Sequence, residues 1–188
     1  AISGKVESDM EVNGLADINY SLGLRYDDFS DVGESVSSFV GIFFKPEIRG
    51  LKGKFQLSSN FRPPSFNEMY YLNYGNNDLK PEKSLSMNLG LIDNTFENIN
   101  VEMDVFYMIT NDRIVSVPKS QISWSAENIA RVITKGCEFS LNIDLFEKYF
   151  NLNFAYTYQD VRNSVKGDNN YGKLIVYMPQ EVMSGSTI

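Results

Sequence analysis

Residues 12–26 read VNGLADINYSLGLRY, a stretch in which apolar and polar side chains alternate. Every second residue from Val12 to Tyr26 lies on one largely apolar face, and the other face carries Asp17, Asn19 and Arg25. This period of two is typical of a β-strand with one apolar and one polar face. The stretch exceeds the roughly 5 or 6 residues of a soluble strand and reaches the roughly 9 to 11 needed to cross a bilayer. It therefore predicts a membrane-spanning strand.

The same alternation recurs along the chain. Residues 36–44 are the exception, because they are apolar or small on both faces. The alternation is found at residues 54–61, 84–91, 99–107, 138–145 and 150–159. Charged residues fall on the polar faces, which suits a water-filled or plugged lumen; they are Arg25, Lys54, Glu102, Asp104 and Glu138. Aromatic residues lie near the strand ends, as an interfacial girdle requires; they are Tyr26, Phe44, Tyr149, Phe150 and Tyr158.

The connections between these stretches alternate between short and long. Short turn-rich breaks lie near Asp9–Asn13, Pro46–Gly50, Asp93–Asn98, Phe146–Tyr149 and Pro179–Glu181, and longer polar segments lie at Tyr26–Ser35, Arg62–Lys83, Thr110–Ala130 and Asp160–Gly172. Outer-membrane barrels place short turns on one rim and longer loops on the other. We therefore predict an all-β fold, part of an antiparallel transmembrane β-barrel, with about ten strands of which the first and last are incomplete.

The composition excludes several classes of function. The chain of 188 residues has a net charge of -7, which argues against a nucleic-acid partner. It has no histidine and a single cysteine, Cys137, so neither Ser-His catalysis nor an imidazole or cysteine-cluster metal site is expected. We expect no catalytic residue, no metal site and no cofactor. The sequence has no apolar run of about 18 residues, so no transmembrane helix is predicted. Residues 1–10 lack the apolar core of a signal peptide, so we expect a mature or internal piece of a protein.

Residues 61–84 read FRPPSFNEMYYLNYGNNDLKPEKS. This stretch resembles the paired boxes of TonB-dependent receptors, commonly FRAPSFNELY followed by GNPDLKPEKS. Pro63, Met69 and Asn77 depart from that form. Further along, Gly136 and Glu138 are similar to a glycine-x-glutamate of the family, and the segments 156–158 and 177–179 are similar to its later YTY and xxP elements.

The resemblance implies that residues 1–188 belong to one barrel domain, truncated at both ends. They would form the C-terminal half of a barrel of about 22 strands, without the plug domain and without a TonB box. The expected location is the bacterial outer membrane, and the expected role is active import rather than catalysis. The implied partners are outer-membrane lipid, the plug of the same protein, TonB, and a metal-chelate or vitamin ligand. A ferric siderophore or cobalamin is the expected cargo, because haem receptors of similar sequence place a histidine between the boxes.

The two boxes also mark the base of one long loop. Pro63 and Pro64 end the strand before the loop, because proline cannot join the interior of a hydrogen-bonded ladder. Arg62 and Glu82 lie at the two ends of this loop, and we hypothesise that they form an ion pair or share a hydrogen-bond network. The alternative is two separately solvated charges, since surface pairs contribute little. The family motif adds two further residues to this loop base, Glu68 and Asn76.

Within the loop, Tyr70, Tyr71, Asn73 and Tyr74 are the candidate ligand contacts. Aromatic rings with polar tips stack on a bulky chelate or hydrogen-bond to it. The alternative is a structured loop whose tyrosines pack on each other.

Two further features have simpler explanations. The acidic residues Asp27, Asp28, Asp31 and Glu34 offer hard oxygen ligands for calcium, but their spacing fits no EF-hand loop, and a solvated acidic loop is the preferred interpretation. Trp124 is interpreted as a packing or interfacial anchor.

Two alternatives remain at the level of the whole chain. A passive porin would share the barrel and the loop pattern but would lack the paired boxes. A soluble β-sandwich binding module would bury its apolar faces against a second sheet.

Overall fold

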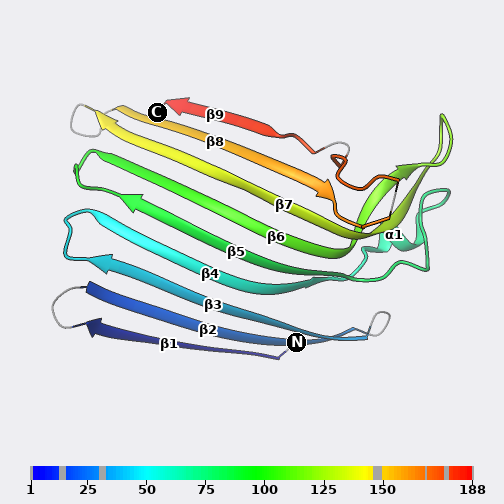
Figure 1. Cartoon of the computed structure of the whole chain (residues 1–188), viewed down its shortest axis with the longest axis horizontal. Coiled ribbons are helices and arrows are strands. Elements are labelled where there is room, and N and C mark those ends of the chain that lie inside the picture. The colour runs from blue at the N-terminus through cyan, green and yellow to red at the C-terminus, as the bar shows by residue number, and fades with distance from the viewer. Residues whose placement is uncertain are drawn as a thin grey trace.

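The alternating stretches form the strands of one antiparallel sheet. The computed structural model describes residues 2–12, 16–29, 33–145, 150–167, 169–175 and 178–187. Within these residues the elements are β1 (Ile2–Val12), β2 (Ala16–Phe29), β3 (Gly33–Pro46), β4 (Leu51–Arg62), α1 (Phe66–Tyr70), β5 (Glu82–Asp93), β6 (Ile99–Pro118), β7 (Trp124–Leu145), β8 (Phe150–Asn163) and β9 (Glu181–Thr187). Each strand pairs with the next, in the order β1 to β9, as Figure 1 shows. The predicted all-β antiparallel architecture is confirmed, with nine strands in the described residues.

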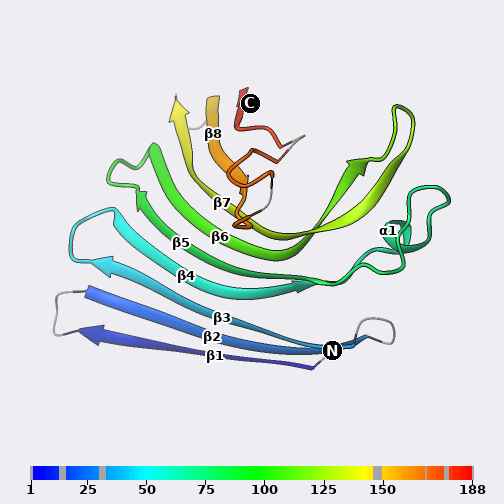
Figure 2. The same cartoon turned by 45° about the vertical axis from the view of Figure 1, so that its right-hand side comes forward.

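The sheet is curved like a segment of a barrel wall (Figure 2). Among the described residues there is no second sheet packed against it. The soluble sandwich alternative is therefore wrong, because a sandwich requires two facing sheets. No helix in the described part of the chain is long and apolar enough to span a membrane.

The register sorts the side chains by chemistry. On one surface, which we call the apolar face, Leu22 lies beside Val40, Val40 beside Leu57, and the row continues through Met87 to Tyr107. These side chains are not covered by protein: Leu89 on the same face is 55% exposed and Met103 is 54% exposed. Of the expected girdle residues, Tyr26, Phe44, Phe150 and Tyr158 share this face, and Tyr149 lies outside the described residues.

The opposite surface, which we call the polar face, lines the hollow of the sheet. Lys54, Gln56, Asn88, Glu102 and Glu138 all border this hollow. All five lie on the polar face that the alternation in the sequence predicts. Buried apolar clusters occur instead near the rim that carries the longer connections: Leu79, Ile114 and Ala126 form one cluster, and Val132, Val161 and Ile175 form the other.

The strands end at two opposite rims, as predicted, but several predicted turns and loops have other positions or lengths in the structure. One rim, the turn rim, carries the connections 47–50 and 94–98, and β1 and β7 end there. The other, the loop rim, carries the connections 63–81 and 119–123 and the described part of 164–180, and β2 ends there. The long loop expected at Tyr26–Ser35 is wrong, since β2 and β3 remain paired out to Phe29 and Gly33. The turn expected at Asp9–Asn13 is placed too early, because β1 is paired through Val12.

The segment Thr110–Ala130 is a β-hairpin rather than a loop. Strands β6 and β7 stay paired as far as Pro118 and Trp124, beyond the reach of β5 and β8. Ile114, Val115 and Val117 favour a strand. Between residues 110 and 130, only Asp112 adopts a left-handed backbone, with φ of 52°. The polar residues around Asp112 therefore led to the prediction of a loop where the structure has paired strands.

The long loop expected at Asp160–Gly172 and the separate short turn expected at Pro179–Glu181 are also wrong. Strand β8 continues to Asn163, and Pro179 belongs to the single long connection before β9. Leu174 makes only an isolated bridge with Arg162 rather than a strand. Phe146–Tyr149 lies outside the described residues.

The exposed apolar face generates the first prediction. Replacing Leu89, in the middle of the apolar run of β5, by arginine is expected to destabilise the protein in phospholipid vesicles by about 2–4 kcal/mol, the cost of a cation near the bilayer midplane. The matched control is Ile122→Arg, because Ile122 is 94% exposed in the tip of the hairpin. The measurement is the urea concentration at which the barrel loses its folded mobility on a gel. Equal midpoints for the two variants would mean that this face does not contact lipid.

Candidate functional site

The connection between β4 and β5 begins with a capped helical turn. Pro63 and Pro64 end β4, and Ser65 then caps α1. The Ser65 hydroxyl accepts a hydrogen bond from the backbone N–H of Glu68 at 3.3 Å, and the Glu68 carboxylate accepts one from the backbone N–H of Ser65 at 2.7 Å. This reciprocal capping box satisfies two N–H groups that a short helix leaves unpaired. It therefore fixes the position of the Glu68 side chain.

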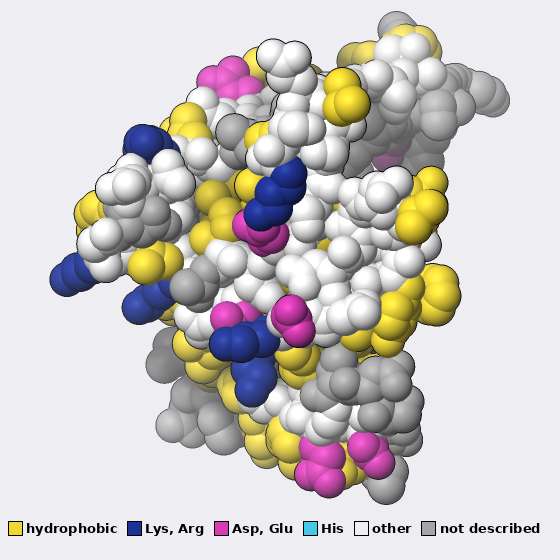
Figure 3. Space-filling view, turned by 90° about the vertical axis from the view of Figure 1, so that its right-hand side faces the viewer, with side chains coloured by type: hydrophobic (Ala, Val, Ile, Leu, Met, Phe, Trp, Pro, Cys, Tyr) yellow, Lys and Arg dark blue, Asp and Glu magenta, His cyan; other side chains and the backbone are white. Residues whose placement is uncertain are grey.

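Arg62 ties this helical turn to the start of the next strand. Its guanidinium donates to Glu68 Oε2 at 3.0 Å and to Glu82 Oε1 at 2.6 Å. The backbone N–H of Ile114 donates to the same oxygen of Glu82 at 2.8 Å. The expected contact between Arg62 and Glu82 is thus present, and it joins β4, α1, β5 and β6 at the loop rim. Figure 3 looks at this rim and shows charges of opposite sign adjoining each other on it.

Burial and hydrogen bonding act in opposite directions on Glu68. Partial burial raises the pKa of its carboxyl group, but the hydrogen bonds from Arg62 and from Ser65 outweigh that effect. The pKa of Glu68 therefore lies below its ordinary value. The ionised form is the one that holds the loop base together.

The protruding β6–β7 hairpin supports the loop from the side. Asn128 acts as a bracket: its side-chain amide accepts from the N–H of Lys80 at 2.8 Å and donates to the carbonyl of Lys80 at 2.9 Å. It also donates to the carbonyl of Asp112 at 2.6 Å. Asn76 donates to the carbonyl of Ala126 at 3.1 Å. Side chains thus satisfy backbone groups that no neighbouring strand reaches.

The four candidate ligand contacts fall into two groups. Tyr74 belongs to the frame, since its ring packs on the cluster of Leu79, Ile114 and Ala126 and its hydroxyl lies 2.8 Å from that of Ser116. Tyr70, Tyr71 and Asn73 are exposed; Tyr71 is 63% exposed and the ring of Tyr70 lies 5.1 Å from that of Phe66. Asn73 takes a left-handed backbone with φ of 64°, which marks the turn of the loop.

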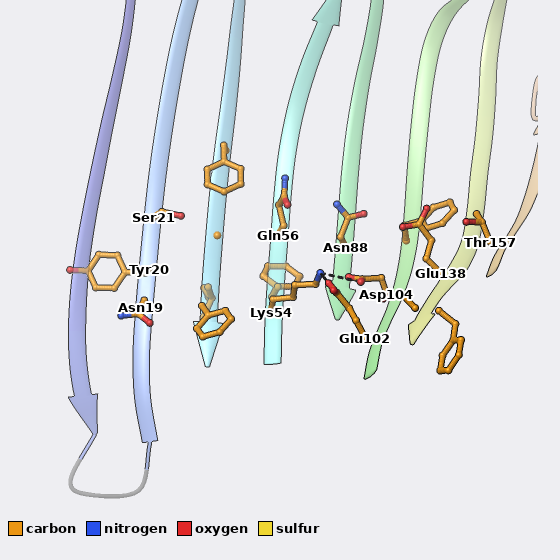
Figure 4. A pocket seen from close by; sticks show the side chains of 18 of the residues that line it. Asn19, Tyr20, Ser21, Lys54, Gln56, Asn88, Glu102, Asp104, Glu138 and Thr157 are labelled. Carbon is orange, nitrogen blue, oxygen red and sulfur yellow. Dashed lines mark hydrogen bonds and ion pairs between the residues drawn. The ribbon is translucent and has the colours of Figure 1, made fainter. Parts of the chain in front are cut away.

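The hollow on the polar face is the second part of the site (Figure 4). Lys54 of β4 forms ion pairs with Glu102 and, at 3.0 Å, with Asp104, both on β6. The lysine reaches across β5 at Gly90, where a Cβ atom would lie 2.3 Å from its Cε. A side chain at this position would displace Lys54 or Asp104, so the missing side chain of Gly90 leaves room for the ion pair. The charge pattern of the strands placed these three residues on the polar face, but only the register shows that they meet.

Five phenylalanines border this hollow, and the three that the register places on the polar face were not singled out by the sequence. These three are Phe39, Phe43 and Phe106. Phe106 lies beside Gly136 in the register, and a Cβ atom at Gly136 would lie 2.6 Å from the tip of its ring. The signal in the sequence was weak, because residues 36–44 are apolar on both faces. The polar face is therefore partly aromatic.

The acidic residues of β2 and β3 do not form a metal site. Asp27 is paired with Arg25 at 2.7 Å, and Asp28 and Glu34 lie in the paired ends of their strands. Asp31 lies outside the described residues. In the described ranges no group of three or more His, Cys, Asp or Glu side chains has the geometry to hold a metal ion.

Comparison with known proteins agrees with this geometry. The family model described as TonB dependent receptor-like, beta-barrel matches residues 6–187. No curated protein sequence matches the chain. The siderophore receptor PirA from Acinetobacter baumannii is similar in structure, with 19% identity and a TM-score of 0.66 over 97% of this chain and 30% of its own length.

Two further solved structures share the fold. The copper transporter OprC has 16% identity and a TM-score of 0.64 over 86% of this chain and 30% of its own. A mutant ferric enterobactin receptor, PfeA from Pseudomonas aeruginosa, in complex with enterobactin, has 16% identity and a TM-score of 0.65 over 92% of this chain and 30% of its own. This chain thus spans less than a third of the length of each of these three proteins.

The bracket formed by Asn128 leads to a prediction. In Asn128→Ala the N–H of Lys80 loses its hydrogen-bond acceptor. The neighbouring hydrogen bond from the N–H of Ala126 to the carbonyl of Tyr74 is then expected to open more often. Hydrogen exchange at these amides is expected to be about tenfold faster, since one hydrogen bond contributes about 0.5–1.5 kcal/mol. Asn77→Ala in the same loop is the control, because the Asn77 side chain is exposed. Unchanged exchange in Asn128→Ala would show that the hairpin does not hold the loop.

The lowered pKa of Glu68 gives a pH prediction with a definite sign. Because its pKa is lower in the folded state, Glu68 stabilises the loop base fully above its ordinary value of 4.5 and loses that contribution as the pH falls through the lowered pKa. Hydrogen-exchange protection at Glu68 and Met69 should therefore decrease below pH 4.5. The Glu68→Gln variant should lack this part of the pH dependence. A variant that titrates like the wild type would assign the effect to another group.

Proposed function

Because the chain belongs to the TonB-dependent receptor-like β-barrel family, we propose that it forms part of the wall and outer loops of an active importer in a bacterial outer membrane. This family consists of receptors, so neither an enzyme nor a passive porin is the appropriate class. The loop rim, which carries the Arg62 network and α1, is assigned to the outside of the cell, because outer-membrane barrels place their longer connections there.

The proposal includes the rest of a barrel. Within the described residues β1 and β9 each pair on one side only. An unpaired strand edge is not tolerated in lipid, because its N–H and C=O groups have no partner there. Further strands of the same protein would close the sheet, and a plug domain would occupy the hollow lined by Lys54 and Gln56. TonB would act through that plug.

The exposed apolar face supports the membrane location. Leu85, Met87, Leu89 and Leu91 form an uninterrupted apolar run on β5 with at least 47% of each side chain exposed. In water such a continuous surface would be unfavourable, whereas in a bilayer it is the expected surface of a barrel. Outer-membrane lipid is therefore the proposed partner of this face.

For the cargo we favour a ferric siderophore over cobalamin. The observation that carries this choice is the pair of exposed rings at Tyr70 and Tyr71, held on a loop that Arg62 and Asn128 fix to the barrel. Rigid aromatic rings suit a chelate with flat aromatic groups, because stacking needs little ordering of the loop on binding. Solved relatives include siderophore receptors and a complex with enterobactin, which agrees with this choice.

The cargo assignment predicts the behaviour of a double variant. Tyr70→Ala/Tyr71→Ala in the full-length receptor is expected to weaken binding of ferric enterobactin roughly 30-fold, since each stacked ring contributes about 1 kcal/mol. The measurement is a fluorescence-quenching or calorimetric titration of the purified receptor. Phe96→Ala is the control, since Phe96 is an exposed aromatic residue on the turn rim.

The same titration with cyanocobalamin decides between the two cargoes. Binding of cyanocobalamin in place of the ferric chelate would replace the siderophore assignment and leave the receptor assignment intact. If the double variant binds the chelate with unchanged affinity, Tyr70 and Tyr71 do not contact the ligand and serve only the structure of the loop.

A further inference from the structure

Two cations stand on the apolar face at the edge of the loop rim. Lys83 of β5 lies beside Asn111 of β6, and Asn111 lies beside Arg131 of β7, so the three occupy one level of the sheet. All three side chains are exposed. Because neighbouring strands are about 4.8 Å apart, the backbones at Lys83 and Arg131 are roughly 10 Å apart. The pair lies directly beyond Leu85 and Ile109, at the end of the apolar run toward the loop rim.

The two cations have no anionic partner within the described residues. Two other cations on this face, Arg162 and Lys135, are paired with a carboxylate. Asp160 accepts a hydrogen bond from Arg162 at 2.8 Å and lies 3.8 Å from Lys135. The patch thus has more positive than negative charge. Positive charge that is left unpaired at a membrane boundary attracts anionic headgroups.

A groove on the same face adjoins these cations. Val36, Phe61, Leu85 and Ile109 provide its apolar lining, and Lys83 and Arg131 border it together with Asn111. Glu34 also lines the groove, on β3. Lys83 lies two strands away from β3, so the cationic part and Glu34 are on different sides of the groove. The groove therefore combines an apolar channel with a cationic border.

We propose that Lys83, Arg131 and this groove bind a phosphate-bearing lipid of the outer leaflet. The phosphate oxygens would accept charge-assisted hydrogen bonds from the two cations, with Arg131 suited to a bidentate contact and Lys83 acting as a compact charge. An acyl chain would lie along Phe61 and Leu85. The inference rests on the proposed outer-membrane location but is independent of the cargo.

The form of the groove favours a lipid over free phosphate. A free phosphate ion would use the cations alone, whereas the lining of Val36, Phe61 and Ile109 offers apolar contact that only a ligand with a hydrocarbon tail exploits. The groove is also continuous with the exposed run that begins at Leu85. A lipid already in the membrane reaches this site without leaving the bilayer.

The test uses the full-length receptor in detergent and native mass spectrometry. Lipid A carrying its two phosphates is titrated against the wild type and against Lys83→Gln/Arg131→Gln. The expected result is an apparent Kd about 25-fold weaker for the double variant, because two surface cations each contribute about fivefold. Lipid A without phosphates should bind both proteins equally weakly. Competition by inorganic phosphate should be slight, and complete displacement by it would overturn the lipid assignment.

Matched variants separate this site from a general effect of charge. Lys45→Gln/Arg49→Gln removes the same charge from exposed side chains at the turn rim and should bind lipid A like the wild type. Lys83→Arg/Arg131→Lys keeps both charges and should retain binding. Equal loss in the turn-rim control, or no loss in Lys83→Gln/Arg131→Gln, overturns the proposal. Binding of ferric enterobactin is measured in parallel, so a receptor that binds lipid A but no chelate refutes the cargo assignment alone.

Discussion

Backbone pairing between neighbouring strands is the constraint on which the rest of the structure depends. Once Leu22 is opposite Val40 and Val40 opposite Leu57, every side chain of the sheet is assigned to one of two surfaces. A slip of one residue would turn Lys54 and Glu102 outward and Leu89 inward, which a bilayer would penalise strongly. The sequence can therefore specify an apolar and a polar surface on the same strands, simply by alternating side chains.

Outside the sheet, the same need to pair backbone groups is met by side chains. Asn128 pairs with both backbone groups of Lys80 in the way that a neighbouring strand would, and Glu82 accepts from the backbone of Ile114. The loop between β4 and β5 thus becomes ordered without being a strand. Asn76 and Tyr74 contact the hairpin, whereas the rings of Tyr70 and Tyr71 stay exposed, as the proposed ligand contact requires.

The sequence predicted what depends on local pattern. Alternation identified the strands and their two faces, the two prolines located the end of β4, and the paired boxes located the contact of Arg62 with Glu82. It failed where pairing overrides local polarity: the polar run at Asp112 looked like a loop, yet it continues a hairpin because β7 offers a partner. The contact of Lys54 with Asp104 required the register, since the two residues are two strands apart.

The polar face is built to present charge rather than to stabilise the sheet. Lys54, Glu102 and Asp104 remain partly exposed, so their attraction is screened and adds little to stability. Covering the hollow would remove water and strengthen the same interaction, while making any unpaired carboxylate costly. Glu138 lines the hollow without an ion pair among the described residues, so a domain that fills the hollow is best matched to it by a cation or hydrogen-bond donors. The wall in this way restricts what can occupy the lumen.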